Sequence, residues 1–245
     1  AMEGEFRIAA AEGLEDYPGY AFGDQATRVS PVSEPLPSGL ETDGQGRARV
    51  ALPLPQPETS DRPLEMRAIL RLTDASGRPV ERQITRPVAP VAPLIGIRPE
   101  FDGAAPMGGE AGFEVIAFDV GGGRAARDGL RWQLSRLTTF YQWYEMGGEW
   151  NYERVTTRER VADGTLDVPE GAPARLGVPV DWGRYELQIA GQVGGYAVTT
   201  LGFDAGWYAA DAGTGTPDRL EVSADRKSYA PGDTARIRIE APGPG

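Results

Sequence analysis

The sequence predicts an all-β protein made of tandem antiparallel β-sandwiches, with almost no helix. The first observation is composition: 33 glycines and 21 prolines among 245 residues leave little room for long helices. The second is that apolar and polar residues alternate in short stretches between turns rich in Gly, Pro and Asp. The third is an aromatic hairpin at residues 140–152.

The hairpin consists of two aromatic-rich runs that meet at Gly147-Gly148. A Gly-Gly pair tolerates the positive φ angles that a type I′ turn requires at both positions. This turn sets the register of the two strands, and one face then carries four aromatic rings. The expected pairs are Met146 with Glu149, Glu145 with Trp150, Trp143 with Tyr152, and Tyr141 with Arg154.

The four rings on that face form the candidate interaction surface of the sequence: Tyr141, Trp143, Trp150 and Tyr152. Cross-strand aromatic pairs stabilise a hairpin by about 0.2–1 kcal/mol each, whether or not they bind anything. Two interpretations therefore stay open. The cluster is structural or covered by a neighbouring domain, or it is an exposed platform for a sugar or a partner protein.

The charge of the chain argues against several partners. A formal net charge of −11 and a pI near 4.7 repel phosphate backbones and anionic membrane surfaces. We therefore expect neither nucleic acid nor direct membrane contact. The sequence has no apolar run of 18 residues and no signal-peptide pattern, and its two ends suggest an excised fragment.

The chain contains neither cysteine nor histidine. Their absence excludes cysteine nucleophiles, Ser-His-Asp triads, disulfides and the usual zinc and copper sites. Catalysis would have to rest on carboxylates, Lys or Tyr. A glycosidase would need two acidic residues, but no recognisable motif holds such a pair. We expect no enzyme activity, no catalytic or metal-binding residues and no cofactor.

The first expected domain covers residues 1–92. Strands are expected at 5–8 and 48–52, followed by a hairpin at 66–84, with a short helix over 64–75 as the alternative. Around a Pro-Gly turn, Tyr17, Tyr20 and Phe22 should plug the end of a sandwich. Three prolines at three-residue spacing favour an extended connector, which places a boundary near residue 92.

The second expected domain covers residues 93–209 and forms an antiparallel sandwich with turns at Asp128-Gly129 and Asp163-Gly164. The alternation slips at residues 136–139, as it does at a β-bulge. Its strands are expected at 94–98, 111–120, 130–144, 150–159, 164–168, 174–179, 183–190 and 198–203.

Residues 210–245 contain a small, polar linker and then two further alternating stretches around Val222 and Ile237. Two strands cannot close a sandwich, because a lone hairpin buries too little apolar surface. We interpret this part as the linker and first strands of an incomplete third domain.

Several stretches, taken in order over nearly the whole chain, together resemble the bacterial alpha-2-macroglobulin family. They are Tyr17-Pro-Gly-Tyr-Ala-Phe-Gly23, Leu94-Ile-Gly-Ile-Arg-Pro99, Tyr141-Gln-Trp-Tyr144, Asp181-Trp-Gly-Arg-Tyr185, Ala205-Gly-Trp207, and Thr216-Pro-Asp-Arg-Leu220 with Ser228-Tyr-Ala-Pro-Gly-Asp233. The specificity lies in their order, because Tyr-x-Pro-Gly-Asp alone occurs at strand entries of many exported sandwiches.

The resemblance implies a large periplasmic protease trap, lipid-anchored to the inner membrane, of which this chain holds two middle domains and the start of the domain that bears the bait region. In that family a protease cuts the bait region and triggers attack by a Cys-Gln thioester. No residue of the thioester can be placed here, since the chain has no cysteine. The expected function is a non-catalytic scaffold whose partners are neighbouring domains and, for the whole protein, proteases. The alternative is a carbohydrate-binding β-sandwich that uses the aromatic surface.

Overall fold

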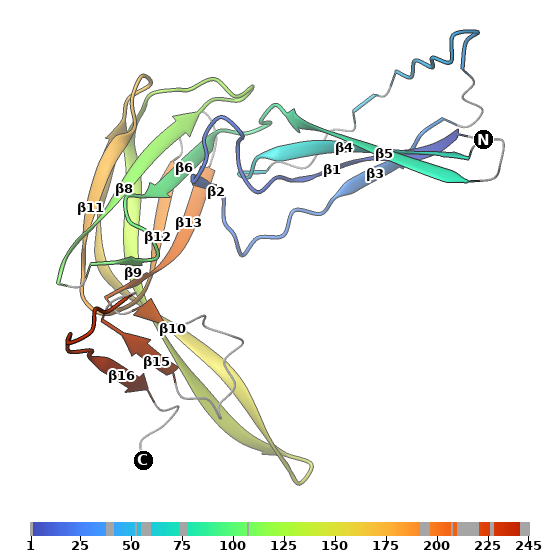
Figure 1. Ribbon diagram of the computed structural model, residues 1–245. Helices are drawn as coiled ribbons and strands as arrows, with labels where there is room; N and C mark the ends of the chain where they lie inside the picture. The colour runs from blue at the N-terminus through green and yellow to red at the C-terminus, as the bar shows by residue number, and fades with distance from the viewer. Residues whose placement is uncertain are drawn as a thin grey trace.

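The computed structural model describes residues 2–37, 42–51, 53–54, 60–73, 78–106, 108–191, 197–206, 208–209, 221–225 and 228–240. These residues form β-strands and contain no helix, which confirms the all-β prediction. The helical alternative for residues 64–75 is wrong over the described part, since β4 (Leu64–Thr73) is a strand. The strands assemble into four sheets (Figure 1).

The centre of the molecule is a sandwich of two sheets. One sheet has the order β10-β9-β12-β13-β7 and the other the order β11-β8-β6-β2. The strands of the first are β10 (Glu149–Val168), β9 (Arg127–Met146), β12 (Gly183–Gly191), β13 (Ala197–Ala205) and β7 (Ala104–Ala105). Those of the second are β11 (Ala174–Val180), β8 (Gly109–Phe118), β6 (Leu94–Pro99) and β2 (Ala21–Phe22).

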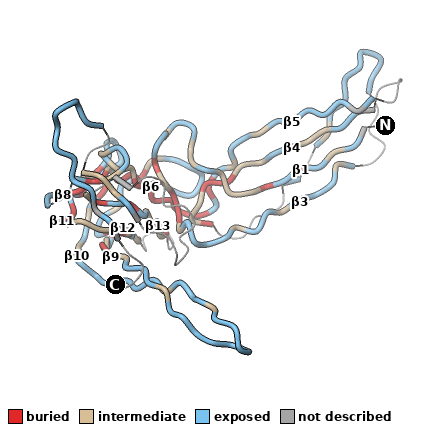
Figure 2. The backbone as a smooth tube through the Cα atoms, turned by 60° about the horizontal axis from the view of Figure 1, so that its bottom comes forward, coloured by how far each residue is buried: buried red, intermediate tan, exposed pale blue. Residues whose placement is uncertain are grey.

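Alternating side chains from both sheets fill the sandwich. Along β11 every second residue is buried, from Ala174 to Val180, and along β12 the buried residues are Tyr185, Leu187 and Ile189, as the alternation predicted. A single apolar cluster joins these residues of the two facing sheets, together with Phe113 on β8. Burial is therefore concentrated in this sandwich (Figure 2).

The N-terminal part forms a separate sheet with the order β3-β1-β4-β5. It contains β1 (Met2–Ala10), β3 (Val32–Pro35), β4 and β5 (Pro79–Val88), all antiparallel. Phe6 and Ile8 point to its apolar face and are buried. The strand expected at 48–52 is wrong for residues 48–51, which are irregular, and Leu52 lies outside the described residues.

The N-terminal part also contributes a strand to the central sandwich. Ala21 and Phe22 of β2 pair with Ile97 and Gly96 of β6. Phe22 then joins Tyr20 in a second apolar cluster with Leu94, Ile116 and Phe118. The aromatic plug expected from the sequence therefore covers the sandwich that follows it in the chain.

Strands β9 and β10 are much longer than their neighbours, with 20 residues each. The turns expected at Asp128-Gly129 and Asp163-Gly164 are wrong, since both dipeptides lie within these strands. Gly164 is opposite Trp132, and a side chain there would lie 2.9 Å from the indole ring. The glycine thus leaves space for the Trp132 ring within a continuous strand and does not form a turn.

The bulge expected at residues 136–139 of β9 is also misplaced. Those residues keep a continuous register with β10, and the irregularities fall between Arg160 and Ala162 and between Leu166 and Val168 of β10. Strand β9 is paired on both sides up to Leu137, whereas β10 is an edge strand. An edge strand accommodates an extra residue at lower cost, because only one ladder is disturbed.

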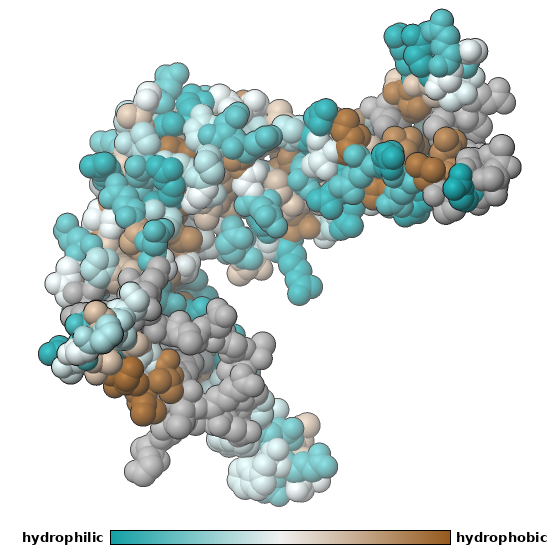
Figure 3. Space-filling model, in the orientation of Figure 1, coloured by the Kyte–Doolittle hydropathy of each residue, from teal (hydrophilic) through white to brown (hydrophobic). Residues whose placement is uncertain are grey.

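A fourth, small sheet lies at the C-terminal end of the described chain. It contains β14 (Tyr208–Ala209), β15 (Glu221–Ala224) and β16 (Ile237–Glu240), in that order. Val222 pairs with Ile239, and both side chains are exposed, as is Ile237. Brown apolar atoms mark this part of the surface at the lower left of Figure 3.

The close packing of Phe22 on Gly96 predicts the effect of a single methyl group. In Gly96→Ala the new Cβ would lie 2.7 Å from Phe22 Cε1 and 2.8 Å from Ile116 Cγ1, both in the core. We expect a loss of about 1–3 kcal/mol in the free energy of unfolding, measured with urea.

The matched control is Gly44→Ala, because nothing lies within 4 Å of the added Cβ there. Its unfolding free energy should stay within about 0.5 kcal/mol of wild type. A Gly96→Ala chain as stable as this control would contradict the described packing of β2 on β6.

Candidate functional site

The predicted register of the aromatic hairpin is confirmed. Glu149 pairs with Met146, Trp150 with Glu145, Tyr152 with Trp143, and Arg154 with Tyr141. The turn has the expected conformation, with φ angles of 66° at Gly147 and 85° at Gly148. Glycine is favoured at both positions, since most side chains disfavour positive φ angles.

The hairpin extends beyond the sandwich. The last pairing of β9 with β12 joins Leu137 to Arg184, so residues 138–146 pair only with β10. We call residues 138–157 the aromatic ribbon. It protrudes from one end of the sandwich (Figure 1) and is about 30 Å long at 3.4 Å per residue.

The four predicted rings lie together on one side of the ribbon, its front face. Tyr141 contacts Tyr152 edge to face at 5.8 Å, and Trp143 contacts Tyr152 at 5.4 Å with an interplanar angle of 57°. The exposed fractions are 69% for Trp150, 50% for Trp143 and 43% for Tyr152, while Tyr141 is half-buried. The rings stabilise one another yet remain open to solvent in this chain.

The sequence interpretation missed the opposite side of the ribbon. Its rear face carries Phe140, Tyr144 and Met146, with exposed fractions of 45%, 42% and 67%, and half-buried Val155 opposite Phe140. The same register that defined the front face assigns these residues to the other side, so the signal was present. The ribbon thus exposes large apolar side chains on both faces, with polar residues such as Gln142 and Asn151 between those of the rear face. It looks pale to teal in Figure 3, because the hydropathy scale rates Tyr and Trp as weakly hydrophilic and polar side chains lie beside them.

A second feature joins the N-terminal part to the sandwich, and hydrogen bonds between distant residues define it. The Gly23 N–H donates to Thr199 Oγ1 at 3.0 Å, and the Thr199 hydroxyl donates to the Ile95 carbonyl at 2.6 Å. The Thr200 N–H donates to the Gly23 carbonyl, and its hydroxyl donates to Asp24 Oδ1. We call these contacts, with the packing of β2 on β6, the joint.

A polar cluster extends the joint at its outer side. The Tyr20 hydroxyl donates to Glu114 Oε2 at 2.7 Å, and Arg98 donates to the same oxygen at 2.5 Å while lying over the Tyr20 ring. Burial raises the pKa of Tyr20 to about 12, and the hydrogen bond to Glu114 acts in the same direction. The hydrogen bond from Tyr20, followed by that from Arg98, lowers the pKa of Glu114. Both groups are held in the protonation states that favour their contact.

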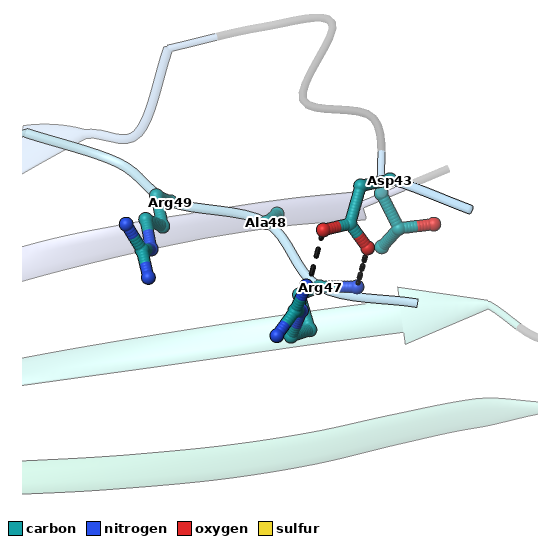
Figure 4. Close-up of a pocket in the computed structure, with 5 residues that line it drawn as sticks. Asp43, Arg47, Ala48 and Arg49 are labelled. Atoms are coloured by element: carbon teal, nitrogen blue, oxygen red, sulfur yellow. Dashed lines mark hydrogen bonds and ion pairs between the residues drawn. The ribbon is translucent and has the colours of Figure 1, made fainter. Parts of the chain in front are cut away.

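A shallow depression on the loop at residues 42–49 is not a chemical site (Figure 4). The Asp43 carboxylate accepts hydrogen bonds from the N–H groups of Gln45 and Arg47 and from Arg47 Nε. These contacts close the loop and lower the pKa of Asp43, the bond from the Arg47 N–H most. The hydrogen-bonding capacity of the carboxylate is therefore used to stabilise the turn.

Two further searches of the described residues were negative. They contain no group of three His, Cys, Asp or Glu side chains placed to hold a metal ion. No helix in the described ranges is long and apolar enough to cross a membrane.

The sheets follow one another along the chain and define a protein built from β-domains in series, and comparison with known families identifies two of these domains. Residues 1–90 match the bacterial alpha-2-macroglobulin MG5 domain, and residues 96–207 match bacterial macroglobulin domain 6. The chain therefore belongs to the bacterial alpha-2-macroglobulin family, of which it contains the MG5 and MG6 domains. Alpha-2-macroglobulins are protease inhibitors and not enzymes.

The similar proteins are bacterial alpha-2-macroglobulins. That of Xylella fastidiosa is 31% identical over 95% of this chain, and that of Escherichia coli is 29% identical over 94%. The native conformation of the E. coli protein matches 98% of the chain at 25% identity with a TM-score of 0.64. A trypsin-activated structure of the E. coli protein matches the same share with a TM-score of 0.54. The chain spans only 14% of the length of the X. fastidiosa relative.

The raised pKa of Tyr20 predicts how stability depends on alkaline pH. The folded protein keeps the phenolic proton up to about pH 12, whereas the unfolded chain loses it near pH 10.0. The contribution of this group is therefore complete below pH 10 and is lost as the pH rises toward 12. In Tyr20→Phe that part of the decline should disappear from the unfolding free energy measured against pH.

The control for this experiment is Tyr144→Phe on the exposed ribbon, which leaves Tyr20 and Glu114 in place. It should retain the alkaline decline of the wild type. Equal declines in Tyr20→Phe and wild type would contradict the role assigned to the buried phenol.

Proposed function

We propose that this chain is a non-catalytic scaffold segment of a bacterial alpha-2-macroglobulin that acts as a broad-spectrum protease trap. In this proposal residues 1–92 and 93–209 are two macroglobulin domains with fixed relative positions. Residues 210–245 form a linker and the first strands of the domain that bears the bait region. The chain holds neighbouring domains in position, and the trapping chemistry belongs to other parts of the longer protein.

The observation that carries the proposal is the joint. Strand β2 comes from the N-terminal part, yet it completes a sheet of the sandwich formed mainly by residues beyond 92. Hydrogen bonds from Gly23 to Thr199 and from Tyr20 to Glu114 reinforce the connection. A segment whose task is to hold neighbours in place benefits from such rigid contact, because flexible linkage would allow the domains to move independently.

The absence of cysteine from the sequence supports the same division of labour. A thioester requires a cysteine, so covalent capture must be supplied elsewhere in the protein. Relatives support the link to proteases, since the E. coli alpha-2-macroglobulin was solved after activation by trypsin and by porcine elastase. We propose proteases as targets of the whole protein and its neighbouring domains as partners of this segment, without nucleic acid or direct membrane contact.

We propose the periplasm as the location, with the whole protein lipid-anchored to the inner membrane. This location is supported by the membership of the chain in the bacterial alpha-2-macroglobulin family, because resemblance to that family implies a periplasmic, lipid-anchored protein. The strongly acidic composition agrees with a segment held away from an anionic membrane surface.

The alternative function, a carbohydrate-binding module, has one observation in its favour, the exposure of Trp143 and Trp150. The geometry of the rings argues against it. Sugar rings stack best on open aromatic faces, but Tyr152 is tilted by 57° to Trp143 and by 77° to Tyr141. A ribbon that also exposes large apolar side chains on its rear face fits protein contact better than a one-sided sugar platform.

The proposal predicts that the 245-residue chain alone neither inhibits nor covalently captures a protease. We would incubate it with trypsin, follow hydrolysis of a small and a protein substrate, and look for adducts on a denaturing gel. Without a thioester, no adduct and no inhibition are expected.

The full-length protein is the positive control, and it should protect the protein substrate while leaving hydrolysis of the small substrate intact. Inhibition or an adduct with the 245-residue chain would assign trapping to this segment. A full-length protein that fails to inhibit trypsin and elastase would contradict the proposed function.

A further inference from the structure

The aromatic ribbon exposes far more apolar surface than a protruding hairpin needs for its own stability. Front-face residues Trp143 and Trp150 and rear-face residues Tyr144 and Met146 are all between 42% and 69% exposed. Polar residues such as Gln142 and Asn151 lie between the apolar side chains of the rear face. Large apolar side chains that are this exposed on both faces of a two-stranded ribbon still indicate that both faces are covered in the complete protein.

The ribbon is too small to form a stable interface through only one of its faces. A ribbon about 30 Å long and 10 Å wide offers roughly 300–500 Å² per face, while a stable interface buries about 800 Å² per partner. A second copy stacked on one face would therefore form only a weak contact. Burial of both faces reaches the required area, and a slot with two walls achieves this.

The register of the sandwich indicates which part of the protein lies beside the ribbon. Ala205, where β13 ends, pairs with Gly183, and the next residue of β12, Arg184, pairs with Leu137 at the base of the ribbon. The chain thus leaves the sandwich at the end from which the ribbon projects. Figure 1 shows the fourth sheet, formed by β14, β15 and β16, at this end, opposite the N-terminal sheet. That sheet has exposed apolar residues of its own, including Ile239.

The charge of the ribbon adds a requirement for its partner. Glu145 and Glu149 flank the turn, and neither forms an ion pair within the described part of the chain. An acidic tip enters a protein slot favourably only if basic groups face it, because an unpaired charge is costly to bury. The partner surface should therefore be apolar along its walls and basic at its floor.

We propose that the aromatic ribbon inserts between further domains of the same polypeptide, with the domain that begins at β15 and β16 forming one wall of the slot. This inference rests on the proposed function, in which the chain is one segment of a longer protein. It assigns the ribbon a role as a wedge that fixes the segment to the domain bearing the bait region.

The experiment uses the full-length protein with a photo-crosslinking residue on each face. We would prepare Trp150→benzoylphenylalanine for the front face, Met146→benzoylphenylalanine for the rear face, and Val120→benzoylphenylalanine as the control. Val120 is 58% exposed and lies in the loop between β8 and β9, at the end of the sandwich where β9 begins, whereas the ribbon lies at the opposite end of β9. Mass spectrometry would then locate the linked peptides, after thermal melting has shown that each variant is folded.

We expect intramolecular cross-links from both ribbon positions, at least one of which reaches residues beyond 221. The Val120 variant should give no cross-link to those peptides. Combining Glu145→Lys with Glu149→Lys should strongly reduce both ribbon cross-links, while Glu170→Lys, an exposed acidic residue outside the ribbon, should leave them unchanged.

Other occupants give different results, each of which overturns the proposal. Covalent dimers would identify a second copy, and adducts only after protease addition would identify the target protease. Cross-links from one face alone, cross-links to lipid, or none at all would exclude a two-walled slot. Inhibition of trypsin by the same preparations is measured separately: cross-links without inhibition would contradict the proposed function, and inhibition without cross-links would contradict the wedge.

Discussion

The antiparallel pairing of β9 with β10 is the interaction on which the rest of this structure depends. The same two strands form one side of the sandwich and then continue as the aromatic ribbon. Their register, set by the Gly147-Gly148 turn, decides at once which side chains enter the core and which face solvent. A shift by one residue would exchange buried Leu134 with its neighbours and move the rings of Trp143 and Trp150 to the other face.

The second constraint is the strand that the N-terminal part contributes to the sandwich at the joint. Strand β2 covers an edge of the sandwich that would otherwise expose unpaired backbone groups next to β6. The space for Phe22 exists because position 96 is glycine, and Thr199 satisfies the N–H of Gly23. Packing, backbone pairing and side-chain hydrogen bonds thus act at one place, which is how a short segment can orient a whole sheet.

The sequence predicted the features that depend on local patterns. Alternation identified the buried residues of β12, and the Gly-Gly turn gave the ribbon register correctly. The errors came from local signals with another cause. Asp163-Gly164 has the composition of a turn, but the glycine accommodates the ring of Trp132 within a continuous strand.

The joint could not be predicted, since its partners are separated by long stretches of sequence. Gly23 and Thr199 are 176 positions apart, and no local motif marks either as the partner of the other. The rear face of the ribbon was different, because the predicted register already implied it. The sequence interpretation considered only the four rings of the front face and left out Phe140, Tyr144 and Met146 of the rear face.

The central claim is that the joint holds the N-terminal sheet and the sandwich as one rigid scaffold. The chain has no cysteine, so Gln83→Cys on β5 and Glu170→Cys after β10 provide two unique sites for spin labels on exposed positions. Electron spin resonance would then measure the distance distribution between the labels. The account predicts a single narrow distance distribution in the otherwise unaltered chain. The distribution should broaden in the Gly96→Ala variant, because the added methyl group disrupts the packing of Phe22. A broad distribution in the otherwise unaltered chain would contradict the claim that this segment is a rigid scaffold.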